Sequence, residues 1–257
     1  TPSSFAYLKD APFPRLGNYT MISPTAQAQF GGFEGKPWER TIDEIERNMA
    51  LFDLTFGFGQ YPDNDPGFPD RLRALNPRAV LLPYFIGQEK LANERAEGAR
   101  GADPTAIADI RYLLGISPLW QVKDSAGTFV NDLDFPGILK LDISPDCPQV
   151  GGKSFADYQI EFVREGFFAS GIYDGIFIDN LFARMNPHIP SAYKLGGLDY
   201  DLNRNGRRDE TPAMLNRVSL SGGMKLLEGL KAASGGLELV MGNNGPLPEP
   251  RFAPYVN

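Results

Sequence analysis

The chain has 257 residues and a net charge of −7, from 32 acidic and 25 basic residues. This length suits one large core. The absence of a Lys/Arg cluster argues against nucleic acid as a partner, and no apolar run approaches the roughly 20 residues of a membrane helix. The single Cys147 excludes an internal disulfide. The single His188 disfavours zinc hydrolases, which usually use two or three histidines, and we expect it to lie in a surface loop.

Strand-like and helix-like segments alternate along the chain. In chain order we predict strands at residues 19–23, 54–58, 79–86, 138–144, 173–180 and 237–243, and helices at residues 37–52, 70–75, 104–114, 154–170 and 212–233. The run AVLLPYFI at residues 79–86 is typical of a strand buried on both faces of a parallel sheet. Further predictions are a hairpin over residues 120–130, a polar insertion at about residues 183–212 and the beginning of another strand at the final PYVN.

Repeated strand–helix units predict a parallel α/β architecture with right-handed connections. No G-x-G-x-x-G follows the first strand, so a dinucleotide-binding fold is disfavoured. The length matches a (β/α)8 TIM barrel of roughly 250 residues. The strand signals fall short of a closed barrel, so we expect residues 1–257 to form one barrel domain that is incomplete here and continues beyond residue 257. An open sheet is the alternative.

The segment DGIFIDN at residues 174–180 carries the strongest functional signal. Alternation along a strand places Phe177 and Asp179 on one face, and Ile176 and Ile178 on the other. Asp179 ends this apolar strand, where barrel enzymes keep their active residues. A carboxylate in this place is costly unless it reaches a polar site. We therefore expect Asp179 to be catalytic, although capping of the next loop would also account for it.

The segment YDGIFIDN resembles a strand of several glycoside-hydrolase-like barrel families, among them hypothetical bacterial glycosyl hydrolases and the polygalactosaminidase-like family 114. Trp120 to Gly127, WQVKDSAG, and Leu141 to Pro145, LDISP, are similar to the segments that precede that strand. The resemblance covers roughly residues 15–257. It implies a barrel fold, glycosidase activity on a polysaccharide or oligosaccharide, and a catalytic role for Asp179.

Other polar and aromatic residues are candidates for substrate binding. Asp142 ends its own strand and is expected either to line the same site or to cap the following loop. Asn180 and Asn243 also end strands and could hydrogen-bond sugar hydroxyls. Trp120 could stack on a sugar ring, although burial is the commoner fate of such a residue. Asp174 precedes its strand and is expected to be structural.

The segment DLNRNGRRD at residues 201–209 matches the front of an EF-hand-type calcium loop, with Gly206 at the turn. The expected ligands are the side chains of Asp201, Asn203, Asn205 and Asp209 and the backbone carbonyl of Arg207. Pro212 stands where such loops have a bidentate Glu, so Glu210 or Asp199 would have to replace it. We predict a structural Ca²⁺; an Asn/Gly-rich turn without metal is the alternative.

The function we expect is glycoside hydrolysis by two carboxylates. Asp142 and Glu249 are weak candidates for the second one. The related families place a Glu on a later strand, so we expect the partner to lie outside these 257 residues. The alternatives are a carbohydrate-binding barrel without catalysis and a metal-dependent hydrolase on the same fold. The amino-terminal TPSSFAYLKD shows no secretory signal, which a mature protein would have lost, and we expect an extracellular or periplasmic location.

Overall fold

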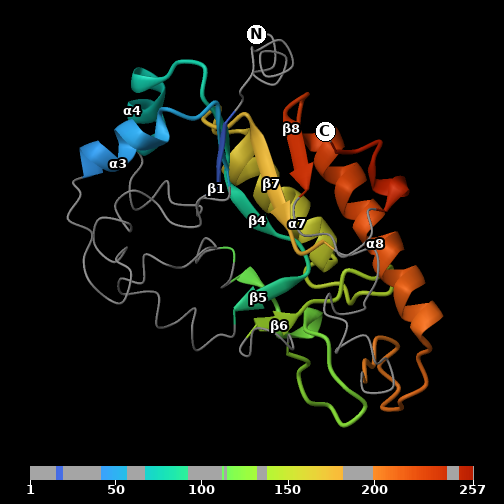
Figure 1. The fold of residues 1–257 in the computed structure, drawn as a ribbon. Helices are drawn as coiled ribbons and strands as arrows, with labels where there is room; N and C mark the ends of the chain where they lie inside the picture. Colours follow the sequence, from blue (N-terminus) through green and yellow to red (C-terminus); the bar gives the residue numbers. More distant parts are fainter. Residues whose placement is uncertain are drawn as a thin grey trace.

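The computed structural model describes residues 16–19, 42–56, 67–91, 112, 115–131, 138–181, 199–241 and 249–256. Figure 1 shows their arrangement: parallel strands run through the middle, and helices lie beside them.

Two three-stranded parallel sheets form the centre of the molecule. One contains β1 (Gly17–Tyr19), β2 (Leu54–Phe56) and β3 (Val80–Leu82), and the other contains β4 (Tyr84–Ile86), β7 (Gly175–Asp179) and β8 (Glu238–Met241). Only Pro83 separates β3 from β4. The Phe177 N–H donates to the Pro83 carbonyl at 2.9 Å, and the Asp174 N–H donates to the Leu81 carbonyl at 3.1 Å. Within these two sheets, β1, β2, β3, β4, β7 and β8 therefore succeed one another in chain order, without a reversal.

One predicted strand of the series lies outside this parallel arrangement. Within residues 138–144, only β6 (Ile138–Lys140) is a strand, and it pairs antiparallel with β5 (Glu89–Leu91). The reason is the hairpin before it, whose backbone occupies the other edge: Val122 N–H donates to Lys140 O at 3.0 Å, and Lys140 N–H donates to Val130 O at 3.0 Å. That hairpin, at residues 120–130, was predicted and is confirmed by the bridge between Lys123 and Phe129.

The helices largely follow their predicted ranges. They are α3 (Ile42–Met49), α4 (Phe68–Leu75), α7 (Phe155–Val163) and α8 (Pro212–Ala233). Ser154 caps α7 in a capping box with Asp157, which satisfies backbone N–H groups that the first turn leaves free. A π-helical turn, η4 (Arg164–Phe168), extends α7, and Gly171 follows at φ +68°, a conformation that glycine adopts without strain. The predicted helix at residues 104–114 lies almost wholly outside the described residues.

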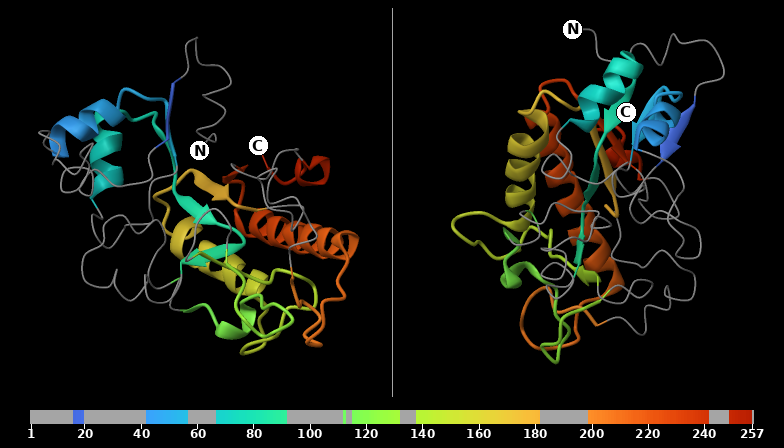
Figure 2. Two further views of the ribbon diagram at one scale, coloured as in Figure 1. Left: turned by 60° about the horizontal axis from the view of Figure 1, so that its bottom comes forward. Right: turned by 90° about the vertical axis from the view of Figure 1, so that its left-hand side faces the viewer.

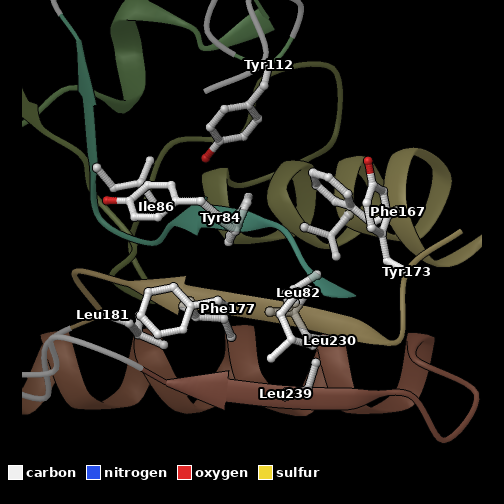
Figure 3. Close-up of a cluster of buried hydrophobic side chains, with 14 of the residues drawn as sticks. Leu82, Tyr84, Ile86, Tyr112, Phe167, Tyr173, Phe177, Leu181, Leu230 and Leu239 are labelled. Carbon is white, nitrogen blue, oxygen red and sulfur yellow. The ribbon is translucent and has the colours of Figure 1, made fainter. Parts of the chain in front are cut away.

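The core lies between the β4-β7-β8 sheet and the pair α7 and α8, which pack side by side on one face of that sheet (Figures 1 and 2). Figure 3 shows part of this cluster, with Phe177 from β7 and Leu230 from α8 among its members. Ile176 and Ile178 are fully buried. Apolar side chains therefore cover both faces of β7. A charged group at the end of such a strand is costly unless polar partners hydrogen-bond to it.

Helix α8 approaches the backbone after β6 so closely that only glycine fits at Gly222. A Cβ there would lie 1.9 Å from the Ile143 carbonyl oxygen, which belongs to the backbone and cannot rotate aside.

We expect Gly222→Ala to destabilise the protein by roughly 1–3 kcal/mol, the usual cost of overpacking. Gly166→Ala is the control, because its Cβ would meet only ring atoms of Phe162 at 3.9 Å. Urea denaturation of both variants measures the difference. Equal midpoints for the two variants would contradict the close approach.

The carboxyl-terminal segment corrects another expectation. The last described residues form a short 3-10 helix, η6 (Pro250–Phe252), followed by a turn, so the described part of PYVN, residues 254–256, does not begin a strand. Phe252 is buried against α8, and the Tyr255 hydroxyl donates to Glu228 at 2.7 Å. These contacts hold the segment against α8. Among the described helices, none is both long and apolar enough to cross a membrane.

Candidate active site

Asp179 is the last residue of β7 and is 7 % exposed. The Tyr84 hydroxyl on β4 donates to Asp179 Oδ2 at 2.5 Å. The parallel register explains the contact, since Tyr84 lies opposite Phe177 and Ile86 lies opposite Asp179. Residues 84, 86, 177 and 179 therefore share a face, and the rings of Tyr84 and Phe177 lie 6.3 Å apart. The strand alternation predicted for Phe177 and Asp179 is consistent with this arrangement.

Asn180 follows Asp179 in the left-handed backbone region, at φ +49°. Asn tolerates this conformation better than most residues. Its N–H turns back to donate to Asp179 Oδ1 at 2.9 Å. The backbone of Asn180 therefore holds the Asp179 carboxylate. Substrate binding by the Asn180 side chain stays a prediction.

The chain beyond β4 runs alongside this turn. Gly87 N–H donates to Asp179 O at 2.8 Å, and Gln88 N–H donates to Asn180 O at 3.1 Å. From α7, the buried Gln159 Nε2 donates to Gly87 O at 2.7 Å. The carboxyl ends of β4 and β7 are thereby fixed to each other and to the helix behind them, which holds the Asp179 backbone rigidly.

Asp142 lies beyond β6 with its side chain fully buried. It caps its own loop, because Ser144 N–H donates to Asp142 Oδ1 at 2.9 Å. Its other oxygen accepts a hydrogen bond from Arg204 Nη2 at 3.1 Å, and the same nitrogen donates to Leu119 O at 3.0 Å. Burial raises the pKa of the Asp142 carboxyl, and the Ser144 and Arg204 contacts oppose part of that rise. Loop capping at Ser144 and pairing with Arg204 therefore explain why a carboxylate lies at position 142.

Trp120 is a core residue in this structure, which corrects its expected place as a stacking platform. It is 3 % exposed, and its ring lies 5.7 Å from Phe155 and 5.3 Å from Tyr158. Its indole N–H donates to Pro148 O at 2.9 Å. Both the apolar ring and its polar nitrogen are therefore used inside the protein, as is common for tryptophan.

Asp174, at the other end of β7, is structural as predicted. It pairs with Arg73 of α4 at 2.9 Å and accepts a hydrogen bond from Leu81 N–H at 2.8 Å. It ties α4 to the amino-terminal end of the β3–β7 region, at the opposite end of the strand from Asp179.

The predicted calcium loop folds as a compact turn around Asp201. Its two oxygens accept hydrogen bonds from the N–H groups of Asn205 and Gly206, both at 2.9 Å. The amide groups of Asn203 and Asn205 donate to Asp209 at 3.0 and 2.8 Å. These two contacts lower the pKa of the Asp209 carboxyl, and that of Asn205 is the larger cause. The five residues named for this loop lie in one turn, with Gly206 at φ +71°.

Three features anchor the loop to the body of the protein. Asp199 accepts hydrogen bonds from the Ser125 hydroxyl at 2.5 Å and from its N–H at 3.2 Å. Asp201 N–H donates to Lys123 O at 2.8 Å. A second apolar cluster joins the hairpin, the loop and α8; its buried members are Val122, Tyr200, Leu202 and Leu215. The hairpin and loop therefore form one unit, which Arg204 connects to Asp142.

No group of three or more His, Cys, Asp or Glu side chains within the described ranges is arranged to hold a metal ion. The calcium prediction for the loop depends on its two asparagines as well as its aspartates. His188 and Asn243 lie outside the described residues.

Tyr84 and Arg204 were not among the candidate residues. Tyr84 lies inside the apolar run AVLLPYFI. Its hydroxyl was the one signal in that run for a hydrogen bond to a polar side chain on a neighbouring strand. Arg204 lies at the fourth position of the predicted calcium loop, and its sequence surroundings carry no sign of a buried partner.

No family model and no curated protein matches the chain. Among solved structures, it is similar to alpha-L-fucosidase isoenzyme 2 from Paenibacillus thiaminolyticus, with a TM-score of 0.47 and 12 % identity. The similarity covers 90 % of this chain and 32 % of the fucosidase chain, so this chain spans about a third of that protein's length. A likeness this distant identifies neither a fold nor an activity.

Proposed function

We propose that this chain is a glycoside hydrolase domain on a (β/α) barrel and that Asp179 is one of its two catalytic carboxylates. The observation that carries the proposal is the position of Asp179: it ends a strand buried on both faces, at the carboxyl edge of parallel strands that succeed one another in chain order. That edge is where barrel enzymes place their chemistry. The chain-order sequence of strands also favours a barrel over a doubly wound sheet, in which the order reverses.

In this proposal the Asp179 carboxylate acts at the anomeric carbon or on the attacking water, and a second carboxyl group protonates the leaving oxygen. Tyr84 and the Asn180 N–H orient the Asp179 oxygens. Asp142 is a poor candidate for the second group, because its side chain is fully buried, pairs with Arg204 and caps its own loop at Ser144.

The experiment is a screen of the protein against a panel of neutral and weakly charged glycans, with reducing-end release as the readout. Turnover that Asp179→Asn abolishes supports the proposal. Binding of a glycan without turnover would identify a carbohydrate-binding barrel instead. Turnover that a chelator abolishes would identify a metal-dependent hydrolase.

We also propose that the loop at residues 201–209 binds Ca²⁺ in a structural role. Support comes from the oxygen-bearing side chains at the first, third, fifth and ninth positions of one compact turn. Glu210 could add a further ligand, since its Oε1 already reaches the loop by accepting a hydrogen bond from Asn203 N–H at 2.9 Å.

Calcium at about 100 times its dissociation constant should stabilise the protein by roughly 2.7 kcal/mol, because the ion binds the folded chain. Differential scanning fluorimetry with Ca²⁺ and with a chelator measures this change, and titration calorimetry measures uptake. Asp209→Ala should remove the effect, whereas Asp146→Ala, at an exposed acid outside the loop, should retain it. Identical melting curves with Ca²⁺ and chelator, together with no heat of binding, would refute a calcium site.

A further inference from the structure

Both oxygens of the Asp179 carboxylate accept hydrogen bonds from fixed donors. Oδ2 receives the Tyr84 hydroxyl at 2.5 Å, and Oδ1 receives the Asn180 N–H at 2.9 Å. The Asn180 donor is part of a left-handed turn, and Tyr84 is 3 % exposed. The Asn180 N–H can move away from Asp179 only if the end of β7 rearranges, and the Tyr84 hydroxyl only if its buried ring moves.

Tyr84 is fixed by its neighbours in the chain and in the sheet. Pro83 precedes it and fixes the chain between β3 and β4. Its backbone is in register with Phe177, and the two rings pack at a 38° tilt. Phe177 is itself fixed by Phe56 on β2, with ring centroids 5.1 Å apart. The hydroxyl of Tyr84 therefore has a defined position, and it reaches Asp179, which lies two residues beyond Phe177 on the same face of β7.

The direction of these hydrogen bonds determines which form of the carboxyl group they favour. An ionised carboxylate only accepts hydrogen bonds, whereas a protonated carboxyl must also donate one. A phenol and a backbone N–H that both donate thus stabilise the anion. In a pair of catalytic carboxyl groups, one is ionised and the other carries the proton for the leaving oxygen.

We propose that Tyr84 is a positioning residue that keeps Asp179 as the ionised member of the pair. The inference rests on the proposed glycosidase function. It excludes Asp179 as the group that protonates the leaving oxygen, and it assigns that task to the partner carboxyl.

The first test needs no substrate. Carbon-13 NMR of Asp-labelled protein follows the Asp179 carboxyl during a pH titration, with Asp179→Asn providing the assignment. In Tyr84→Phe the titration midpoint should rise by about one pH unit, as expected for loss of a hydrogen bond to a charged group. Tyr255→Phe is the matched control, because it removes a hydroxyl that donates to another carboxylate, that of Glu228. Equal midpoints in the wild-type protein and Tyr84→Phe would overturn the inference.

A second variant covers the case in which Tyr84→Phe fails to fold. Incorporation of 3-fluorotyrosine at position 84 keeps the ring and the hydroxyl but makes the phenol a stronger donor. The midpoint of Asp179 should then fall, opposite to the effect of Tyr84→Phe, and an unchanged midpoint would count against Tyr84.

On a glycan that the screen identifies, Tyr84→Phe should lower kcat by about 10- to 100-fold with little change in KM, and the acid limb of the pH profile should move to higher pH. Turnover with an unshifted acid limb would overturn the role of Tyr84 while leaving the proposed function in place. A lack of turnover on every glycan would refute the proposed function itself, and Tyr84 would then have no catalytic role even if the NMR midpoint moves.

Discussion

Asp179→Asn is expected to lower turnover of a glycan substrate by several orders of magnitude, on the order of 10³-fold or more. The substitution preserves shape but removes the charge that the proposed mechanism places at the anomeric carbon or on water. The fold should persist, since the amide oxygen can still accept one of the two hydrogen bonds from Tyr84 and Asn180. Product release followed by chromatography measures turnover, and circular dichroism checks the fold.

The matched control is Asp174→Asn, at the opposite end of the same strand. It weakens the contacts of Asp174 with Arg73 and Leu81, so it should lower stability while leaving kcat of the folded protein near the wild-type value. Near-normal turnover by Asp179→Asn, or an equal loss in both variants, would show that Asp179 is not catalytic.

Arg204→Met should cost roughly 3 kcal/mol of folding stability. Removing one partner of a buried ion pair leaves an uncompensated charge, and the usual cost is roughly 3–5 kcal/mol. We take the lower end because the Arg204 side chain is 35 % exposed, although Asp142 is fully buried. Chemical denaturation at neutral pH measures the change. Arg207→Met is the control, since it removes a charge from the same loop, where Arg207 is exposed.

The loss should also depend on pH, because the pKa of Asp142 is raised in the folded protein. Below the unfolded pKa, near 3.8, Asp142 is protonated in both states and Arg204 has no charge to compensate. As pH rises from there through the folded pKa, the unfolded chain releases its proton first and stability falls. Without Arg204 this window extends to higher pH, so the gap between Arg204→Met and the wild-type protein should widen from about pH 4 to neutrality. A gap that stays constant with pH would show that the pair is not electrostatically coupled.

Local signals in the sequence were sufficient for the described helices and for most of the described strands in the parallel arrangement. Helix α8 begins and ends at its predicted residues, and α7 begins within its predicted range with Ser154 as its cap, since both features depend on neighbouring residues alone. The placement of β6 could not be predicted in this way. Its apolar pattern resembles that of a central strand, but its direction depends on β5 and the hairpin, which are distant in sequence.

The same division holds at the candidate site. Strand alternation was enough to place Asp179 at the end of β7, facing the same side as Phe177. The contact with Tyr84 spans 95 residues and depends on the β4–β7 register, which no short segment encodes. Trp120 shows the converse: its type suggested a sugar platform, but its neighbours Phe155 and Tyr158 come from α7 and make it part of the core.

Pro83, between β3 and β4, affects which part of the protein unfolds first. It has no N–H, so the ladder loses a donor where the strand changes from pairing with β2 to pairing with β7. The β1-β2-β3 side has short strands and the small helices α3 and α4, whereas β4, β7 and β8 are backed by α7 and α8 (Figure 1). Amide hydrogen exchange should therefore be faster in β1 to β3 than in β7, as expected for two cooperative units of unequal stability. Asp179 and Tyr84 both belong to the slower unit, so the geometry of the carboxylate should survive partial unfolding of the other.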